Sequence, residues 1–162
     1  MRQQLISLFL IAALTSPYTW ARGDIPETDL LPLARNLQID GESARNKQLA
    51  IMILFVADNC SFCRIAKNDY IIPMIKSGQY NNKVIIRLIN IGDARIMTDF
   101  HGNKTRMEDF ARAQKVSLTP YVKVFDSGGN ELTNPVIGIV SEDFYGMFLD
   151  EAIDSAVKKL HP

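Results

Sequence analysis

The sequence is poor in the residues that build metal sites and disulfide frameworks. Its 162 residues include only two cysteines, two histidines and one tryptophan. A structural zinc site needs four ligands and a small secreted scaffold needs several disulfides, so neither class is favoured. Charge of one sign is not in excess either, since 18 basic residues face 18 acidic ones. A neutral chain gives no electrostatic reason to expect a nucleic acid or an anionic membrane as partner, and we predict no nucleic-acid partner.

Apolar runs long enough to cross a membrane are lacking as well. The uncharged run Leu5–Leu14 has ten residues, whereas a spanning helix needs about 20. A short basic start with Arg2 precedes it, Pro17 breaks it, and residues 19–21 suit a signal peptidase. The layout predicts a cleaved signal peptide over residues 1–21 and an exported or periplasmic, soluble mature protein that is not embedded in a membrane. A buried N-terminal helix and an uncleaved anchor are the alternatives.

The rest of the composition is that of one ordinary globular domain. With 47% hydrophobic and 22% charged residues, the chain can bury a core. Residues 22–39 contain two prolines and predict a lead-in with a short helix that stops at Asp40–Gly41. The folded domain is therefore expected over residues 40–162.

Periodicity within this domain predicts the element order β-α-β-α-β-β-α. The predicted strands are 48–57, 83–91, 121–125 and 136–140, and the predicted helices are 61–70, 105–116 and 142–160, with Pro73 opening a further helical piece. Thr105 and Glu108 have capping-box spacing, and Ser141 is expected to cap the last helix. The first two strands should be parallel and the last two antiparallel. The predicted fold class is α/β, a mixed central sheet flanked by helices.

The strongest chemical signal is the motif Cys60-Ser61-Phe62-Cys63, at the junction of a buried strand and a helix. Residues three apart on a helical turn share one face, which brings the two sulfurs within reach of a disulfide. At the helix N-terminus Cys60 would have its thiolate stabilised by free N–H groups and by Arg64. Cys60 is therefore the expected exposed nucleophile, and Cys63 the buried resolving thiol.

Two other interpretations of the cysteine pair are less favoured. A metal site would need further ligands, and His101 and His161 do not have ligand spacing. An inert disulfide closing so small a loop would stabilise the fold little. We therefore predict a redox-active Cys60–Cys63 disulfide, with no metal and no other cofactor.

The dipeptide Thr119-Pro120 opens a predicted strand. Proline is tolerated at the first position of a strand, and the sequence alone favours a trans bond there. A cis bond facing the cysteines would instead leave the Thr119 backbone free to pair with an extended substrate. Phe62 and Tyr121 either form an apolar substrate groove or serve in packing. The predicted substrate-binding residues are Ser61, Phe62, Thr119, Pro120 and Tyr121.

Together these features resemble the thioredoxin superfamily over roughly residues 40–160. The segments that carry the resemblance are Ile51–Val56, Cys60–Cys63, Val84–Ile91, Thr119–Val122, the Gly128-Gly129 hairpin and the Gly138 strand with its following helix. Residues 98–111, together with Thr119-Pro120 and residues 136–144, look most like exported SoxW-like thioredoxins, which carry an insertion before the helix that precedes the cis-proline. The resemblance implies a thioredoxin-like fold, a nucleophilic first cysteine and a cis Pro120.

Three positions depart from thioredoxins proper. Asn59 precedes the first cysteine where tryptophan is usual, and Ser-Phe replaces Gly-Pro between the cysteines, so a reduction potential cannot be carried over. Leu54, six residues before Cys60, stands where an acid usually helps to deprotonate the second cysteine. Glu42, Asp58 and Lys67 are conceivable substitutes, and nothing in the sequence selects among them.

These observations predict an exported thiol–disulfide oxidoreductase. The resemblance favours a protein-disulfide reductase that acts on protein or small-molecule disulfides and receives electrons from a membrane thiol–disulfide partner. A disulfide-forming oxidase with the same site, and a non-catalytic binding or assembly factor, are the alternatives.

Overall fold

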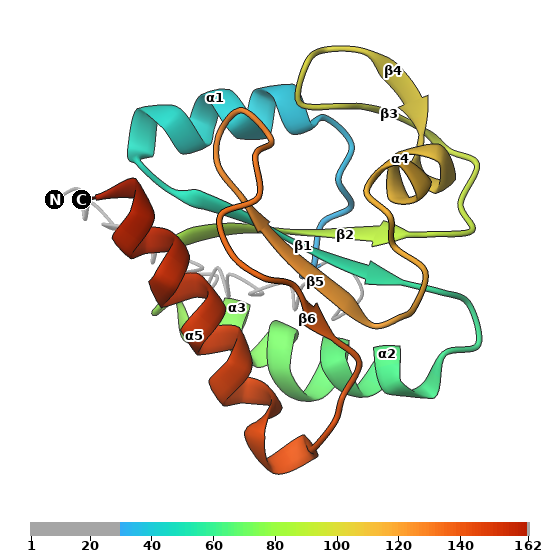
Figure 1. The fold of residues 1–162 in the computed structure, drawn as a ribbon, viewed down its shortest axis with the longest axis vertical. Coiled ribbons are helices and arrows are strands. Elements are labelled where there is room, and N and C mark those ends of the chain that lie inside the picture. Colours follow the sequence, from blue (N-terminus) through green and yellow to red (C-terminus); the bar gives the residue numbers. More distant parts are fainter. Residues whose placement is uncertain (1–29, 162) are drawn as a thin grey trace, which may run out of the picture.

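The structure, a computed structural model, describes residues 30–161 (Figure 1). The predicted signal peptide and residues 22–29 of the lead-in lie outside these residues. The elements in chain order are α1 (Leu37–Lys47), β1 (Ala50–Val56), α2 (Ser61–Ile65), a π-helical segment (Ala66–Ile71), α3 (Ile72–Ser77), β2 (Val84–Asn90), β3 (Ile96–Thr98), β4 (Lys104–Arg106), α4 (Met107–Ala113), β5 (Tyr121–Phe125), β6 (Val136–Ile137) and α5 (Glu142–Leu160). No helix in the described part of the chain is both long enough and apolar enough to cross a membrane.

A mixed four-stranded sheet forms the centre, in the order β2-β1-β5-β6. β1 pairs parallel with β2 and antiparallel with β5, and β5 pairs antiparallel with β6. The apolar run predicted for the first strand is buried along β1, as expected for a strand flanked on both sides and covered on both faces. The α/β fold class is confirmed.

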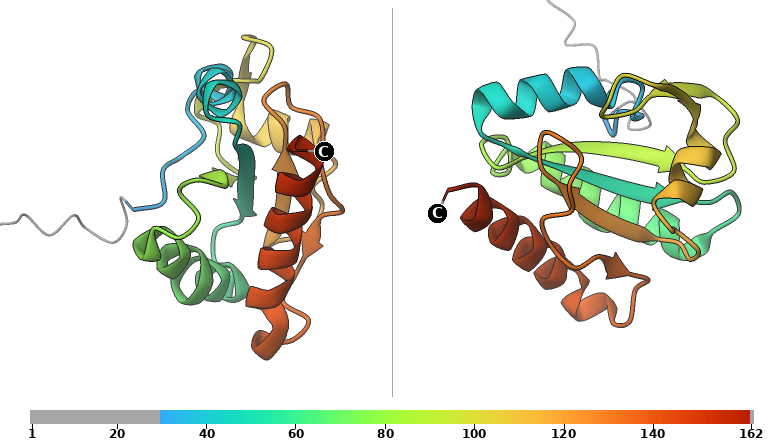
Figure 2. Two further views of the ribbon diagram at one scale, coloured as in Figure 1. Left: turned by 90° about the vertical axis from the view of Figure 1, so that its left-hand side faces the viewer. Right: turned by 45° about the horizontal axis from the view of Figure 1, so that its top comes forward.

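Alternation along β1 divides the core into two layers. One layer holds Met52 and Leu54 with residues of α5 and the π-helical segment, and the other holds Ile53 and Phe55 with residues of α1 and α4. The right-hand view of Figure 2 shows α1 on one side of the sheet and α5 on the other. The sheet is thus buried on both faces, and its open end, where β1 and β2 stop and β5 begins, is left for a site.

The first helix differs from the sequence expectation. Instead of stopping at Asp40–Gly41, α1 begins at Leu37 and runs on to Lys47, so the expected domain boundary at residue 40 falls inside it. The Asn36 side chain caps the helix by accepting from the Ile39 N–H at 3.1 Å. Gly41 is tolerated mid-helix because it packs directly against the Ser127 backbone.

Gly41 and Gly146 are helical glycines for which alanine should have opposite effects. A Cβ at Gly41 would lie 2.4 Å from the Ser127 carbonyl oxygen, so Gly41→Ala should destabilise the protein by about 1–3 kcal/mol. A Cβ at Gly146 in α5 would meet Tyr70 at an ordinary 3.5 Å, so Gly146→Ala should stabilise by about 0.5–1 kcal/mol. Urea unfolding of both variants checks this, and a gain for both would refute the tight α1 packing.

The helix after Cys63 is continuous, where the sequence predicted a helix and a second piece. Pro73 does lie in the first turn of α3, as expected. Before it, the Ile72 N–H donates to the Lys67 carbonyl, which is π-helical spacing. Proline has no N–H and crowds the carbonyl four residues earlier, so a wider turn ahead of it lets the helix continue.

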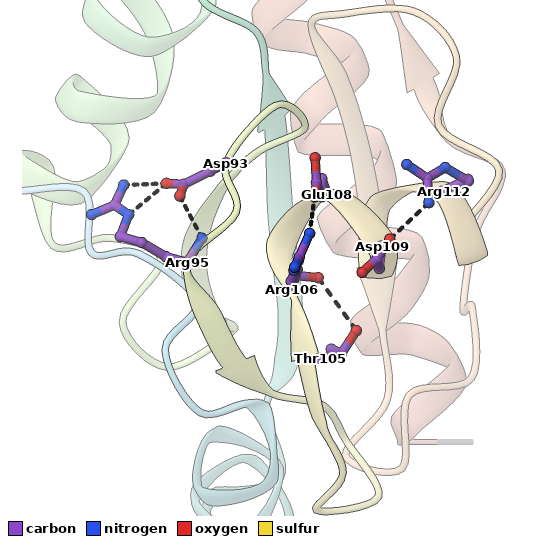
Figure 3. A network of polar contacts seen from close by, with 7 residues as sticks. All are labelled: Asp93, Arg95, Thr105, Arg106, Glu108, Asp109 and Arg112. Atoms are coloured by element: carbon purple, nitrogen blue, oxygen red, sulfur yellow. Dashed lines mark hydrogen bonds and ion pairs between the residues drawn. The ribbon is translucent and has the colours of Figure 1, made fainter.

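The irregular segment before α4 forms the β3–β4 hairpin, a separate two-stranded sheet. The predicted capping box is wrong, because α4 starts two residues later, at Met107, and Arg106 occupies the N-cap without a side-chain bond. The Thr105 hydroxyl donates to the Arg106 carbonyl, while Glu108 accepts from the Arg106 guanidinium at 3.2 Å (Figure 3).

The end of the chain keeps its predicted helix but not its predicted strand or cap. α5 spans Glu142–Leu160, and Ser141 occupies its N-cap without a side-chain hydrogen bond. β6 has two residues instead of five, because the backbone turns at Gly138, where φ is +65°. That left-handed conformation suits glycine and ends the strand.

Two buried tyrosines should respond differently to removal of the hydroxyl. The Tyr145 hydroxyl has no hydrogen-bond partner in the described part of the chain, whereas the Tyr80 hydroxyl donates to Asp150 at 2.5 Å. Tyr145→Phe should therefore leave stability unchanged or raise it by up to about 1 kcal/mol, and Tyr80→Phe should lower it by about 1 kcal/mol. Thermal and urea unfolding compare the two variants, and equal losses would contradict the assignment.

Candidate redox site

A tight loop carries the chain from β1 to Cys60. Asn59 adopts a left-handed conformation with φ +55°, which asparagine accepts more readily than most residues. Asp58, one residue earlier, accepts from the Asn90 amide at 2.7 Å and so ties this loop to the end of β2. The departure at Asn59 thus has a local reason, since it lets the chain reverse into α2.

Cys60 and Cys63 form a disulfide, with Cα atoms 5.2 Å apart. Cys60 occupies the N-cap of α2, and its sulfur accepts from the Cys63 N–H at 3.1 Å. Cys60 is part-buried, whereas Cys63 is only 4% exposed. When the pair is reduced, the same N–H can stabilise a thiolate on Cys60, because a backbone donor at a helix start favours negative charge.

Thr119 and Pro120 lie directly beside Cys60. The antiparallel register sets Tyr121 opposite Phe55, so the residues before β5 reach the end of β1. The Thr119 hydroxyl donates to Cys60 Sγ at 3.6 Å, and the Thr119 carbonyl oxygen is 3.8 Å from that sulfur. The Thr119–Pro120 peptide bond is cis. Four of the residues singled out in the sequence, the two cysteines, Thr119 and Pro120, therefore meet at one end of the sheet.

Gly138 belongs to this neighbourhood, although its sequence pattern predicts only a position in a strand. Its N–H donates to the Pro120 carbonyl at 2.8 Å, which fixes the chain after β6 against the residue next to the disulfide. An isolated glycine in a strand pattern indicates a bulge or a close backbone approach, and that signal could have found it.

The remaining predicted substrate-binding residues differ in exposure. Ser61 is exposed and Phe62 is 52% exposed, both on the first turn of α2. Tyr121 is partly buried, edge-on to Phe55 at 6.5 Å, with the buried Lys123 ammonium 5.8 Å from its ring centre. Burial, and then the Glu131 carboxylate, raise the pKa of Tyr121, so its phenol stays neutral. Phe62 can meet a substrate directly, whereas the Tyr121 ring serves largely in packing.

Because position 54 is a leucine, it places no acidic side chain in the core beneath the site. It is fully buried in β1, between Leu88 of β2 and Val122 of β5. Of the conceivable substitutes, Asp58 lies in the loop just before Cys60, and Lys67 lies in the π-helical segment that follows Cys63. Glu42 is next to Gly41, which packs on Ser127 at the far end of β5, so Glu42 does not belong to the site.

A row of ion pairs lies on the β3–β4 hairpin and α4 (Figure 3). Arg95 pairs with Asp93, and Arg112 pairs with Asp109. The hydrogen bond from Arg95 is the largest influence on Asp93 and lowers the pKa of that carboxyl. Each guanidinium here is matched by a carboxylate, so the insertion adds little net charge. Within residues 30–161, no group of three or more His, Cys, Asp or Glu side chains could hold a metal ion.

Comparisons with known proteins agree with this geometry. Among solved structures, oxidised mitochondrial thioredoxin 3 from Saccharomyces cerevisiae is similar at 18% identity with a TM-score of 0.52, covering 79% of this chain and 96% of that one. A thioredoxin-fold protein from Helicobacter pylori is similar at 16% identity with a TM-score of 0.52, covering 83% and 91%. At such identities the likeness concerns the fold. A search of curated sequences found no match.

The family comparison identifies the family of the chain, whereas the structural comparison concerns only its fold. The family described as thioredoxin-like domain matches residues 37–152, which includes all of β1 to β6 and both cysteines. The match, the mixed sheet and the disulfide at the start of α2 are consistent with a thiol–disulfide oxidoreductase. The chain belongs to the thioredoxin-like domain family.

Proposed function

We propose that the protein is a thiol–disulfide oxidoreductase that acts as a reductase of protein or small-molecule disulfides. The observation that carries the proposal is the Cys60–Cys63 disulfide at the start of α2, with its outer sulfur against Thr119. Cys60 is part-buried at a helix start, a setting that would stabilise a thiolate and that a purely structural disulfide would not need.

The different exposures of Cys60 and Cys63 support a separate role for each sulfur. In the reduced protein the Cys60 thiolate attacks a substrate disulfide, and one substrate sulfur leaves as a thiolate. Cys63 then loses its proton and attacks Cys60 in the mixed disulfide. The second substrate sulfur leaves, the Cys60–Cys63 disulfide forms, and two electrons have passed to the substrate. Because Leu54 offers no acid, the Cys63 proton goes to water or to a group at the rim, for which Asp58 and Lys67 are the candidates.

The experiment that tests the direction is the reduction potential of the pair, measured by equilibration with glutathione. We expect a value near about −270 mV, which is thioredoxin-like and suits a reductase. A value near about −120 mV would make the protein a disulfide-forming oxidase. A pair that does not form the disulfide at all would leave only a non-catalytic binding or assembly factor. Binding that survives Cys60→Ser and Cys63→Ser together would support that third function.

The compartment is a further part of the proposal. Residues 1–21 support a signal peptide, and the segment around residues 98–111 supports a relation to exported SoxW-like thioredoxins. An exported reductase needs its electrons from a membrane thiol–disulfide partner, because reducing equivalents are kept inside the cell. Fractionation of cells that express the full chain tests export. A shortened mature protein outside the cytoplasm is expected, and a full-length protein inside it would refute export.

A further inference from the structure

A cavity of about 530 Å³ lies between β6 and α5, away from the sulfurs. Residues 133–140 form one wall and the outer face of α5 forms the other, and Figure 1 shows the two segments side by side. We call it the β6–α5 cleft and define it by Ile137, Gly138, Val140, Phe148, Glu151 and Ser155. Its volume is in the range of binding sites.

The cleft has an exposed apolar lining. Val140 is 90% exposed, Ile137 43% and Phe148 39%. Phe144, one turn before Phe148 on α5, is 54% exposed and extends the same helix face. Single exposed apolar residues are ordinary, but a group of them around one cavity marks an interaction surface.

The charge around the cleft is negative on balance. Glu151 lines it, Glu142 and Asp143 stand at the start of α5 just after Val140, and none of the three forms an ion pair with another described residue. The cation that lines the cleft, Lys159, keeps its charge, because its ammonium donates to the neutral Leu132 carbonyl, so three carboxylates face one ammonium. A partner with lysine or arginine side chains would therefore be favoured over an acidic one.

The backbone of β6 suits an extended chain. β6 is an edge strand, paired on one side only, with β5. The Gly138 N–H bonds to the Pro120 carbonyl, so in the alternating antiparallel pattern the N–H and C=O of Ile137 point away from β5. An added strand could pair with these groups while its side chains enter the cleft.

We propose that the β6–α5 cleft binds an extended segment of a partner protein that carries alternating apolar and basic side chains. The cleft is connected to the redox site through the pairing of β6 with β5. Ile137 is opposite Tyr121, two residues after Thr119, which contacts Cys60. A segment held on β6 therefore delivers a neighbouring cysteine to Cys60. The effect of the cleft on the rate of exchange rests on the proposed exchange function, whereas the binding of the segment to the cleft does not.

Binding is tested on the oxidised protein by amide NMR. The probes are short synthetic peptides without cysteine, one of alternating valine and lysine and one of alternating valine and glutamate. The lysine peptide should shift the resonances of residues 133–140 and of the Phe144–Ser155 face of α5, and should bind at least about tenfold more tightly than the glutamate peptide. Glu151→Lys should remove that preference. Equal binding of the two peptides would overturn the proposal. So would shifts confined to Phe62 and to Leu118, the exposed residue just before Thr119 at the redox site. So would concentration-dependent shifts without peptide, which would assign the cleft to a second copy.

The kinetic arm uses the same peptides with one cysteine joined to thionitrobenzoate. Cys60 of the reduced protein attacks the peptide sulfur, the activated S–S bond breaks and thionitrobenzoate leaves. Cys63 then attacks Cys60 and releases the peptide thiol.

Phe148→Ser should lower kcat/KM for the lysine peptide about tenfold relative to a small aromatic disulfide. The control Ile96→Ser, which alters a more exposed apolar residue on β3, should change neither rate. An unchanged kcat/KM in Phe148→Ser would refute the cleft. Failure of the unaltered protein to reduce even the small disulfide would refute the exchange function, and the NMR result would still decide the cleft.

Discussion

Cys63→Ser should accumulate a covalent complex between Cys60 and its substrate, while Cys60→Ser should accumulate none. The reason is the asymmetry of the pair, because the Cys60 sulfur borders Thr119 at the open end of the sheet and Cys63 is 4% exposed. Without the resolving thiol, the mixed disulfide has no internal route to breakdown. Turnover with insulin should fall to the uncatalysed background in both variants. Non-reducing electrophoresis detects the complex.

The double variant with both cysteines replaced by serine is the control for non-covalent association. It should give no complex under the same conditions, and its unfolding should resemble that of the reduced protein. A complex formed by Cys60→Ser and not by Cys63→Ser would reverse the roles of the two sulfurs. A complex that survives reduction would show that the association is not a disulfide.

Leu54→Asp should destabilise the protein by about 3 kcal/mol or more at neutral pH. The new carboxylate would be buried between Leu88 and Val122, with apolar neighbours on both strands. Burial raises the folded-state pKa of such a carboxyl above its unfolded value near about 3.9. Both states are protonated well below that pH, so the charge penalty is absent there. It grows as the pH rises from the unfolded pKa to the folded one. Urea unfolding at several pH values measures it.

Leu54→Asn is the matched control, since asparagine has nearly the same shape as aspartate but carries no charge. Its loss of stability should not vary over the same pH range. In Leu54→Asp the rate of exchange at Cys63 should increase, because a carboxylate at this position could accept its proton. Unchanged stability and unchanged exchange would together show that Leu54 is not buried beside the site.

The parts of the fold that the sequence predicted well are those decided by burial. The run that became β1 contains only apolar side chains and has strand length, so no other element competes for it. The bounds of α5 followed from its polar start and regular apolar face. The Cys60–Cys63 spacing likewise predicted the disulfide, because two cysteines three positions apart on a helical turn lie on one face within reach of each other.

The parts that failed depend on contacts between distant segments. The first helix passes through Gly41 because Ser127 packs against it, which no local pattern records. The capping box predicted at Thr105 does not form, because Thr105 belongs to β4 and pairs with β3 in the hairpin. The β6–α5 cleft was not foreseen for a related reason, since Val140 and Phe148 each have the appearance of core residues in the sequence.

The contact between Cys60 and Thr119 joins residues 59 positions apart, and it exists only after β5 has paired with β1. The two sulfurs of the disulfide, in contrast, are only three positions apart, so the chain keeps them close to each other whether or not the sheet has formed. The spacing of the pair is thus encoded locally, whereas the surface that a partner meets beside Cys60 comes from a distant part of the chain and depends on the complete sheet. A change that loosens β5 would therefore leave the cysteine pair in place and remove the Thr119 wall beside it.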